Sequence, residues 1–508
     1  MAREEKFIEH IQNGYTTKGD YIFMGAAMLE GNPFPEAQIK IPLKTLNRHG
    51  LIAGATGTGK TKTLQILAEN LSEKGIPVLL MDIKGDLSGI AQPASINEKL
   101  EARHKIIGFE FKPQASPVEI LSLSEQPGVR LKATVSEFGP VLLARILDLS
   151  DTQTGILAIV FKYCDDHHLP LLDLKDLKKI IQFATEEGTE EFEKSYGRMS
   201  KMSTGTILRK IVALEQQDAD LFFGEPSFEV QDLVRKTPEG KAYVNIIRLT
   251  DIQDKPKLFS TFMLSLLAEI YSTFPEKGDS DKPELVLFID EAHLIFKEAS
   301  GALLDQIESI IKLIRSKGVG IFFVTQNPTD VPKEVLSQLG LKIQHSLRAF
   351  TANDRKAIKL TAENYPISEF YDTKEVLTSL GIGEALISAL DEKGRPTPLA
   401  ATMMRAPMSR MDILTPQEIN NLINVSQLFS KYNKTIDRES AYELLNQKIE
   451  RAGEEDAKEK AKKEREIVER TASRSGRSSG KSQGAIIKVL TSATFIRGVL
   501  SILNKAFK

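Results

Sequence analysis

A glycine-rich octapeptide, G-A-T-G-T-G-K-T, occupies residues 54–61 and leaves few folds open to this chain. A short apolar run at residues 51–53 precedes it, and a segment with helical periodicity at residues 61–72 follows it. The spacing matches G-x-x-x-x-G-K-[ST], a loop whose glycines let successive backbone N–H groups surround a phosphate at the amino end of a helix. The chain is therefore predicted to contain an α/β domain in which a strand, this loop and a helix follow one another.

The loop residues predict a nucleoside triphosphate and Mg²⁺ as ligands. The Lys60 ammonium is expected to reach the β- and γ-phosphates, and the Thr61 hydroxyl to ligate Mg²⁺. ATP is favoured over GTP because the guanine-recognition pattern N-K-x-D is absent; residues 433–437, N-K-T-I-D, have one residue too many and lie outside the expected core. The predicted nucleotide-binding residues are Gly54, Ala55, Thr56, Gly57, Thr58, Gly59, Lys60, Thr61 and Lys62.

A second apolar run, at residues 285–289, ends in two carboxylates, Asp290 and Glu291. An uninterrupted apolar run of this length is typical of a strand that is buried on both faces. At the carboxyl end of such a strand, Asp290 would hold Mg²⁺ and Glu291 would orient and deprotonate an attacking water. A kinase-type loop usually lacks this glutamate, so the pair favours ATP hydrolysis over phosphoryl transfer to a substrate.

Two further segments extend the predicted site. Gln326 follows the apolar run 321–325 and is expected to hydrogen-bond the γ-phosphate or the catalytic water. The sequence D-I-K-G-D at residues 82–86 comes at the end of another apolar run, which begins at residue 76. This segment could sense the nucleotide or contact Mg²⁺ through a bound water. The alternative is a solvated turn after the strand.

An arginine from a neighbouring subunit is expected to complete the site, because negative charge develops on the γ-phosphoryl oxygens during hydrolysis. Arg315 ends a helix predicted at about residues 301–316 and is the favoured candidate. Arg348 and Arg355 follow the next apparent strand and are the alternatives. For each of the three, an ordinary surface role remains open.

Hydrophobic periodicity divides the chain into segments. Strand-like and helical patterns alternate in the predicted core, which favours a partly or mainly parallel sheet. The predicted segments are a small N-terminal β segment at 1–45, an ATPase core at 46–125 and 241–410, a helical insertion at 126–240, C-terminal helices at 411–449, a charged flexible linker at 450–483 and an amphipathic helix at 484–508.

Composition and charge limit the choice of partners. The 508 residues carry a formal charge of −2, which excludes a general electrostatic attraction to nucleic acid. A DNA contact must use a local basic surface, for which Arg198, Lys201, Arg209 and Lys210 are candidates, with a solvated helix face as the simpler interpretation. One cysteine, no signal peptide and no apolar run of membrane-spanning length predict a cytoplasmic protein.

The last segment, 484–508, has apolar residues on one helical face and contains Lys and Arg but no Asp or Glu. This pattern predicts docking on a partner subunit or another protein, with contact to an anionic membrane surface as the alternative.

Several motifs together resemble the HerA–FtsK superfamily of ring-forming P-loop ATPases. They are G-A-T-G-T-G-K-T, D-I-K-G-D, L-F-I-D-E-A-H and R-S-K-G-V-G-I-F-F-V-T-Q, in this order along the chain. The longer phrases L-I-R-S-K-G-V-G, Q-N-P-T-D-V-P, Q-H-S-L-R-A-F-T and F-F-G-E-P-S-F resemble the HerA-like bacterial branch often called YjgR-type. The resemblance covers roughly residues 15–410.

The resemblance implies an α/β fold with a RecA-like P-loop NTPase core, a homo-hexameric ring with sites between subunits, and ATP-driven movement on double-stranded DNA. It assigns Lys60 and Thr61 to nucleotide and Mg²⁺, Asp290 and Glu291 to Mg²⁺ and water, and Gln326 to the sensor position. The chain departs from the superfamily in having only about 45 residues where HerA carries an N-terminal β-barrel, and no evident counterpart of the membrane anchor or winged helix of FtsK. The alternative to a DNA motor is an ATP-gated assembly or signalling module that acts on a protein partner.

Overall fold

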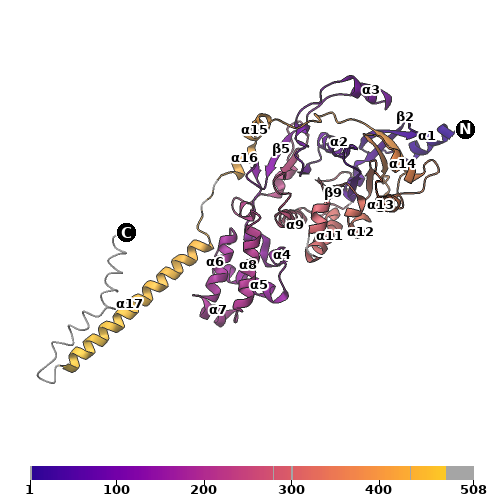
Figure 1. Ribbon diagram of the computed structural model, residues 1–508. Coiled ribbons are helices and arrows are strands. Elements are labelled where there is room, and N and C mark those ends of the chain that lie inside the picture. Colours follow the sequence, from indigo (N-terminus) through magenta and orange to yellow (C-terminus); the bar gives the residue numbers. More distant parts are fainter. Residues whose placement is uncertain (1–2, 279, 299–300, 435, 437, 476–508) are drawn as a thin grey trace. The chain divides into compact units, whose positions relative to one another are not determined.

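The computed structural model describes residues 3–278, 280–298, 301–434, 436 and 438–475, and side chains throughout these ranges except at 297–298, 301–303 and 470–475. The described residues build one twelve-stranded sheet with the order β2-β1-β12-β11-β10-β3-β9-β8-β4-β7-β5-β6 (Figure 1). From β10 to β6 every neighbouring pair is parallel, whereas β2, β1, β12 and β11 join antiparallel. The predicted α/β class with a mainly parallel sheet is thereby confirmed.

The strand bounds follow the apolar runs of the sequence. Strands β4, β8 and β9 are buried along their whole length, as expected for parallel strands that helices cover on both sides. The strands are β1 Tyr21–Leu29, β2 Asn32–Pro42, β3 Gly50–Ala53, β4 Val78–Asp82, β5 Val118–Ser122, β6 Val129–Arg130, β7 Val244–Arg248, β8 Leu285–Ile289, β9 Val319–Thr325, β10 Leu341–Gln344, β11 Glu384–Ser388 and β12 Ala400–Met404.

Helices pack on both faces of the sheet. Leu67 of α2 shares one core with Val324 of β9, whereas Phe296 of α10 contacts the neighbouring Phe323 at a ring-centroid distance of 5.4 Å. Successive side chains of a strand point to opposite faces, so α2 and α10 lie on opposite sides of β9. The helices around the sheet are α1 Arg3–Gly14, α2 Lys60–Glu73, α3 Glu98–Ile106, α9 Pro256–Thr273, α10 His293–Glu298, α11 Gly301–Ile314, α12 Lys333–Leu336, α13 Ala352–Ala362, α14 Thr373–Ser379, α15 Pro416–Asn424 and α16 Gln427–Tyr432.

The N-terminal segment extends the main sheet. Strand β1 pairs with β2 and with β12, which links the start of the chain to the end of the predicted core. Helix α1, which the sequence analysis did not predict, places Phe7 5.3 Å from the ring of Phe370. The Tyr15 hydroxyl donates to the Pro398 carbonyl at 2.8 Å. These contacts tie the described part of the N-terminal segment, residues 3–45, to the core, in keeping with a segment too short to fold alone.

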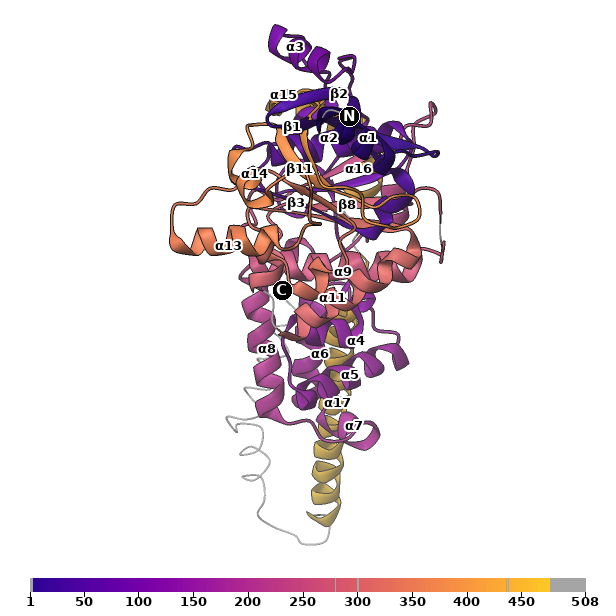
Figure 2. The same ribbon diagram turned by 90° about the vertical axis from the view of Figure 1, so that its right-hand side faces the viewer.

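Five helices fill the interval between β6 and β7 and lie together as a group in both views (Figures 1 and 2). They are α4 Val135–Ile146, α5 Asp151–Asp166, α6 Leu174–Thr185, α7 Thr189–Ser195 and α8 Lys201–Glu215. Side-chain caps mark where several of them begin: Thr134 caps α4 and Asp173 caps α6, each in a reciprocal capping box, and Ser200 caps α8.

The basic residues that the sequence analysis nominated for DNA lie on or beside α8. Lys210 donates to the Asp148 carbonyl, and the Arg209 guanidinium donates to the Thr206 hydroxyl at 2.9 Å. Arg198 lies 3.5 Å from a Glu193 carboxylate oxygen. These side chains make contacts within the insertion, as is usual for polar residues on a solvated helix face. A DNA contact at these residues stays a prediction.

The chain divides into two compact units, Met1–Tyr442 and Glu443–Lys508. Helix α17, Ala441–Ser475, occupies much of the second unit, where the sequence analysis expected a flexible linker from residue 450. Its Ala, Glu and Lys residues are strong helix formers, and an i,i+4 pair joins Lys463 to Glu459 at 2.7 Å. The predicted amphipathic helix at 484–508 lies outside the described residues. None of the described helices is both long enough and apolar enough to cross a membrane.

Candidate nucleotide-binding site

The glycine-rich loop lies between the ends of two parallel strands. Gly54 N–H donates to the Thr325 carbonyl of β9 at 3.3 Å, and Ala55 N–H donates to the Ser346 carbonyl beyond β10 at 2.9 Å. Gly54 has a φ of +150°, and a Cβ there would lie 2.5 Å from the Cβ of His345. Only glycine fits this position, and the loop leads directly into α2 at Lys60.

The two lysines in the first turn of α2, Lys60 and Lys62, point in different directions. The buried Lys60 Nζ donates to the carbonyls of Gly54 at 2.7 Å and Ala55 at 3.1 Å, so its charge lies inside the curve of the loop. Burial lowers the pKa of Lys60, and the nearby positive charge of Lys84 lowers it further. The Lys62 side chain instead donates to the Met411 carbonyl. Its predicted nucleotide contact would therefore use the backbone N–H in the first turn of α2.

The acidic pair ends β8 at the same edge of the sheet as the loop. Asp290 and Glu291 are only 5% and 6% exposed. Burial raises the pKa of Asp290 to about 6. Glu291 has a φ of +47°, an uncommon conformation for a residue with a side chain. One of its carboxylate oxygens pairs with Lys84 Nζ, and the other lies 3.2 Å from His293 Nδ1.

The D-I-K-G-D segment at the end of β4 belongs to this site. Asp82 accepts backbone hydrogen bonds from Gly85 at 2.7 Å, Asp86 at 3.1 Å and Leu87 at 3.3 Å, which closes the segment into a turn. The turn places Lys84 beside Glu291 and lets Asp86 accept a hydrogen bond from the Thr61 hydroxyl at 3.3 Å. Of the two interpretations of this segment, the structure supports a role next to the nucleotide loop.

The sensor glutamine and the arginine candidates lie at different places. Gln326 follows β9, which lies between β3 and β8, so it is exposed at the edge that carries the loop and the acidic pair. Arg315 is exposed in a short 3₁₀ helix, Arg315–Lys317, just before β9, and thus at the opposite edge of the sheet. Arg348 and Arg355 are exposed beyond β10. The fold of one chain does not bring Arg315 to its own loop.

Sequence reasoning missed a buried histidine under the loop. His345 donates its backbone N–H to the Ala53 carbonyl at 2.7 Å, its Nε2 lies 2.9 Å from the Thr63 hydroxyl and its Nδ1 lies 2.8 Å from the Glu384 carbonyl. Burial lowers the pKa of His345 to about 4, so the ring is neutral. The only signal in the sequence was a histidine directly after the short alternating segment L-K-I-Q that forms β10.

A second support comes from the turn before β11. Gly383 N–H donates to the Thr58 carbonyl at 3.0 Å, and Arg103 of α3 in turn donates to the Gly383 and Met404 carbonyls. Thr58 also donates its hydroxyl to the Ala55 carbonyl at 2.7 Å. The loop is therefore held from several strands of the sheet.

The residues present fit a nucleotide with Mg²⁺. The loop offers backbone N–H groups and a buried ammonium to phosphates, while Thr61, Asp86 and Asp290 offer hard oxygen ligands. The Oδ1 atom of Asp86 is buried without a hydrogen-bond partner among the described residues, which suits an acceptor for a metal-bound water. The described residues contain no cluster of three His, Cys, Asp or Glu side chains able to hold a metal.

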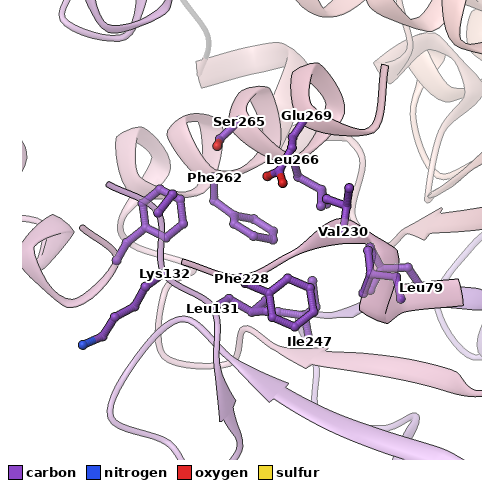
Figure 3. Close-up of a pocket in the computed structure, with 13 residues that line it drawn as sticks. Leu79, Leu131, Lys132, Phe228, Val230, Ile247, Phe262, Ser265, Leu266 and Glu269 are labelled. Atoms are coloured by element: carbon purple, nitrogen blue, oxygen red, sulfur yellow. The ribbon is translucent and has the colours of Figure 1, made fainter. Parts of the chain in front are cut away.

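A separate small pocket lies away from these residues, where α9 meets β4, β7 and the segments that flank the helical insertion (Figure 3). Phe262 and Leu266 of α9 face Phe228 and Ile247 across it, and Glu269 adds a carboxylate. Burial raises the pKa of Glu269 to about 7. None of the predicted nucleotide contacts lines this pocket.

The strand, loop and helix at residues 50–73, with two carboxylates at the same edge of a parallel sheet, define a P-loop nucleotide-binding protein with a RecA-like core. Residues 28–505 match the family described as Helicase HerA-like C-terminal, and the chain belongs to that family. The resemblance to HerA-like ATPases is confirmed, and the assignment to a bacterial branch stays a prediction.

Individual relatives are distant. The DNA double-strand break repair helicase HerA of Sulfolobus acidocaldarius is 24% identical over 355 residues, which cover 69% of this chain and 64% of that protein. The protein of the same description from Sulfurisphaera tokodaii is 25% identical over 360 residues, with coverages of 69% and 64%. The chain thus spans less than two thirds of the length of these relatives.

A solved structure supports the fold. The bacterial conjugative coupling protein TrwBdeltaN70 aligns with a TM-score of 0.50 at 15% sequence identity, over 80% of this chain and 94% of that chain. At this identity the likeness concerns the fold alone.

Proposed function

We propose that this chain is a Mg²⁺-dependent ATP hydrolase that assembles into a homo-hexameric ring and moves along double-stranded DNA. The observation that carries the proposal is the convergence of the loop at 54–61 with Asp290 and Glu291 at one edge of the sheet. Membership of the helicase HerA-like family supports it.

In the proposed mechanism, loop N–H groups and Lys60 hold the β- and γ-phosphates. Thr61 and Asp290 hold Mg²⁺, which offsets negative charge on the phosphates. Glu291 orients the attacking water and takes its proton, and Gln326 hydrogen-bonds the water or the γ-phosphate. Backbone hydrogen bonds from β9 and β10 keep the loop in its curved form, so little reorganisation is needed when phosphate binds.

The ring would supply the missing cation. Arg315 is exposed at the edge opposite to the loop of its own chain, which suits contact with the site of a neighbouring subunit. Such an arginine contributes roughly 10³–10⁵ in rate in related phosphoryl-transfer sites. An Arg315→Ala variant mixed with wild-type chains should lower the turnover of the mixture more steeply than its mole fraction. Linear behaviour would favour Arg348 or Arg355, or a surface role.

The test of hydrolysis uses two variants of the site. Lys60→Ala should lose nucleotide binding, whereas Glu291→Gln should bind ATP and lose turnover by about 10²–10⁴, the usual contribution of a general base. Lys74→Ala, at the far end of α2 beside Asp20, is the matched control for loss of a lysine. Normal turnover by Glu291→Gln would exclude the proposed role of that carboxylate.

DNA dependence is tested separately. The ATPase rate should rise with duplex DNA at low salt, where contacts to phosphates are strongest. A rate that does not respond to DNA would favour the alternative of an ATP-gated module for a protein partner, and deletion of residues 484–508 would then test the docking predicted for that segment.

A further inference from the structure

Lys84 is a second lysine in the nucleotide site, in addition to the one in the glycine-rich loop. Its Nζ pairs with a Glu291 carboxylate oxygen, and its side chain is 37% exposed against 8% for that of Glu291. The half-exposed end of the pair is therefore the ammonium, and the buried end is the proposed general base.

The backbone around Lys84 is fixed while its side chain is long. Asp82 accepts hydrogen bonds from the N–H groups of Gly85, Asp86 and Leu87, and β4 pairs with β8 in parallel up to Met81 and Ile289. The Cα of Lys84 is thus held beside the end of β8. A lysine side chain on a fixed backbone can still move its ammonium through its four flexible carbon–carbon bonds.

Three carboxylates lie near enough to act on the charge of this ammonium. The carboxylates of Asp290, Glu291 and Asp86 act on Lys84, and the charge of Lys84 acts on Lys60. Two ammonium groups close to one another repel unless anions lie between them. Mg²⁺ bound by Asp290 would offset part of the carboxylate charge, so that a phosphate could lie between the two ammonium groups.

We propose that Lys84 binds the γ-phosphoryl group of ATP, and that it leaves Glu291 to do so. The inference rests on the proposed ATP hydrolase function and names a further substrate contact in the same site. In the structure the ammonium of Lys84 forms an ion pair with Glu291, and that ion pair restrains the Glu291 carboxylate. A γ-phosphate competes for the ammonium, and the released Glu291 oxygen becomes available to the attacking water. Lys84 thus adds a contact that ATP makes and ADP lacks, whereas the loop and Lys60 also hold the β-phosphate that both nucleotides carry.

The first experiment compares a non-hydrolysable ATP analogue, the β,γ-imido compound, with ADP, both with Mg²⁺ and measured by calorimetry. A hydrogen bond from a charged donor contributes about 1.5–3 kcal/mol. Because each 1.4 kcal/mol is a factor of ten, Lys84→Met should weaken analogue binding by about tenfold or more. ADP binding should stay within about twofold of wild type, and that result also shows that the variant is folded. Lys84→Arg should restore most of the analogue affinity, and Lys74→Met is the matched control.

Equal weakening for both nucleotides, or no weakening for the analogue, would overturn the inference and leave Lys84 a structural ion pair. Wild-type protein that binds neither nucleotide would instead contradict the proposed function, so the two failures are distinguishable.

The second experiment tests the competition itself. In Glu291→Gln the ammonium of Lys84 has lost the carboxylate with which it forms an ion pair. The analogue should therefore bind at least about twofold more tightly than to wild type, as coupling energies of contacting pairs predict. The gain should be absent for ADP and should vanish in the double variant Lys84→Met/Glu291→Gln. An analogue affinity that does not rise in Glu291→Gln would show that Lys84 does not have to leave Glu291.

Discussion

Replacement of His345 by alanine removes a buried support of the nucleotide loop that comes from another strand. The ring is fully buried, with Nδ1 2.8 Å from the Glu384 carbonyl and Nε2 2.9 Å from the Thr63 hydroxyl. A carbonyl can only accept, so Nδ1 carries the proton and Nε2 accepts from Thr63. The backbone and Cβ of His345 also lie against Gly54, where an added Cβ would come within 2.5 Å of the His345 Cβ.

The expected loss of stability follows from these contacts. Two neutral hydrogen bonds contribute about 1 kcal/mol each, and the cavity left by the ring adds about 1–2 kcal/mol. His345→Ala should therefore lower the free energy of unfolding of the core by about 3–4 kcal/mol. Nucleotide affinity should fall as well, because the loop would no longer be held in the phosphate-binding conformation before the ligand arrives.

Urea unfolding followed by circular dichroism measures the first effect, and titration with a fluorescent ADP measures the second. Thr63→Val removes only the hydroxyl bond, and the cycle of His345→Ala, Thr63→Val and the double variant should give a coupling of about 1 kcal/mol. Thr63→Ser keeps the hydroxyl and serves as the control. If His345→Ala lowered the free energy of unfolding by less than about 1 kcal/mol, the reasoning would be refuted. Unchanged ADP affinity would refute it as well.

Three further predictions concern the same region. Gly54→Ala should abolish ADP binding in the same titration, because its Cβ would clash with His345. Gly57→Ala has open space around its Cβ and should weaken ADP binding only by about 1 kcal/mol of backbone strain. Equal effects of the two variants would contradict this. Burial lowers the pKa of His49 and His345 from 6.5 to about 4, so the unfolded chain binds protons first as the pH falls. Urea unfolding should then show that the free energy of unfolding decreases as the pH falls from 6.5 to 4, with a shallower slope in His345→Ala. An unchanged slope in that variant would show that His345 does not contribute to this pH dependence. Because burial raises the pKa of Asp290 to about 6, protons compete with Mg²⁺ below that pH. Mg²⁺ affinity in the presence of ADP, measured by calorimetry, should fall by about tenfold per pH unit below 6, and an affinity independent of pH would remove Asp290 from the metal site.

The parts of the site that could be predicted are those carried by contiguous residues. The loop at 54–61 and the pair Asp290-Glu291 each follow an apolar run, and burial of that run makes it a strand whose end carries the functional groups. The segment at 450–483, expected to be a charged flexible linker, is helical over its described part. Its charged composition suggested disorder, but Ala, Glu and Lys also have high helix propensity, and α17 continues to Ser475.

Local pattern was sufficient to establish a P-loop chain with a mainly parallel sheet and to place the loop and the acidic pair at its carboxyl edge. Which other side chains reach that edge depended on the strand order, in which β3 lies between β10 and β9. That order brings His345 to Thr63, 282 residues away, and the turn after β4 brings Lys84 to Glu291. Periodicity reports whether a strand is buried but not which strand pairs with it, so these contacts became visible only in the folded chain.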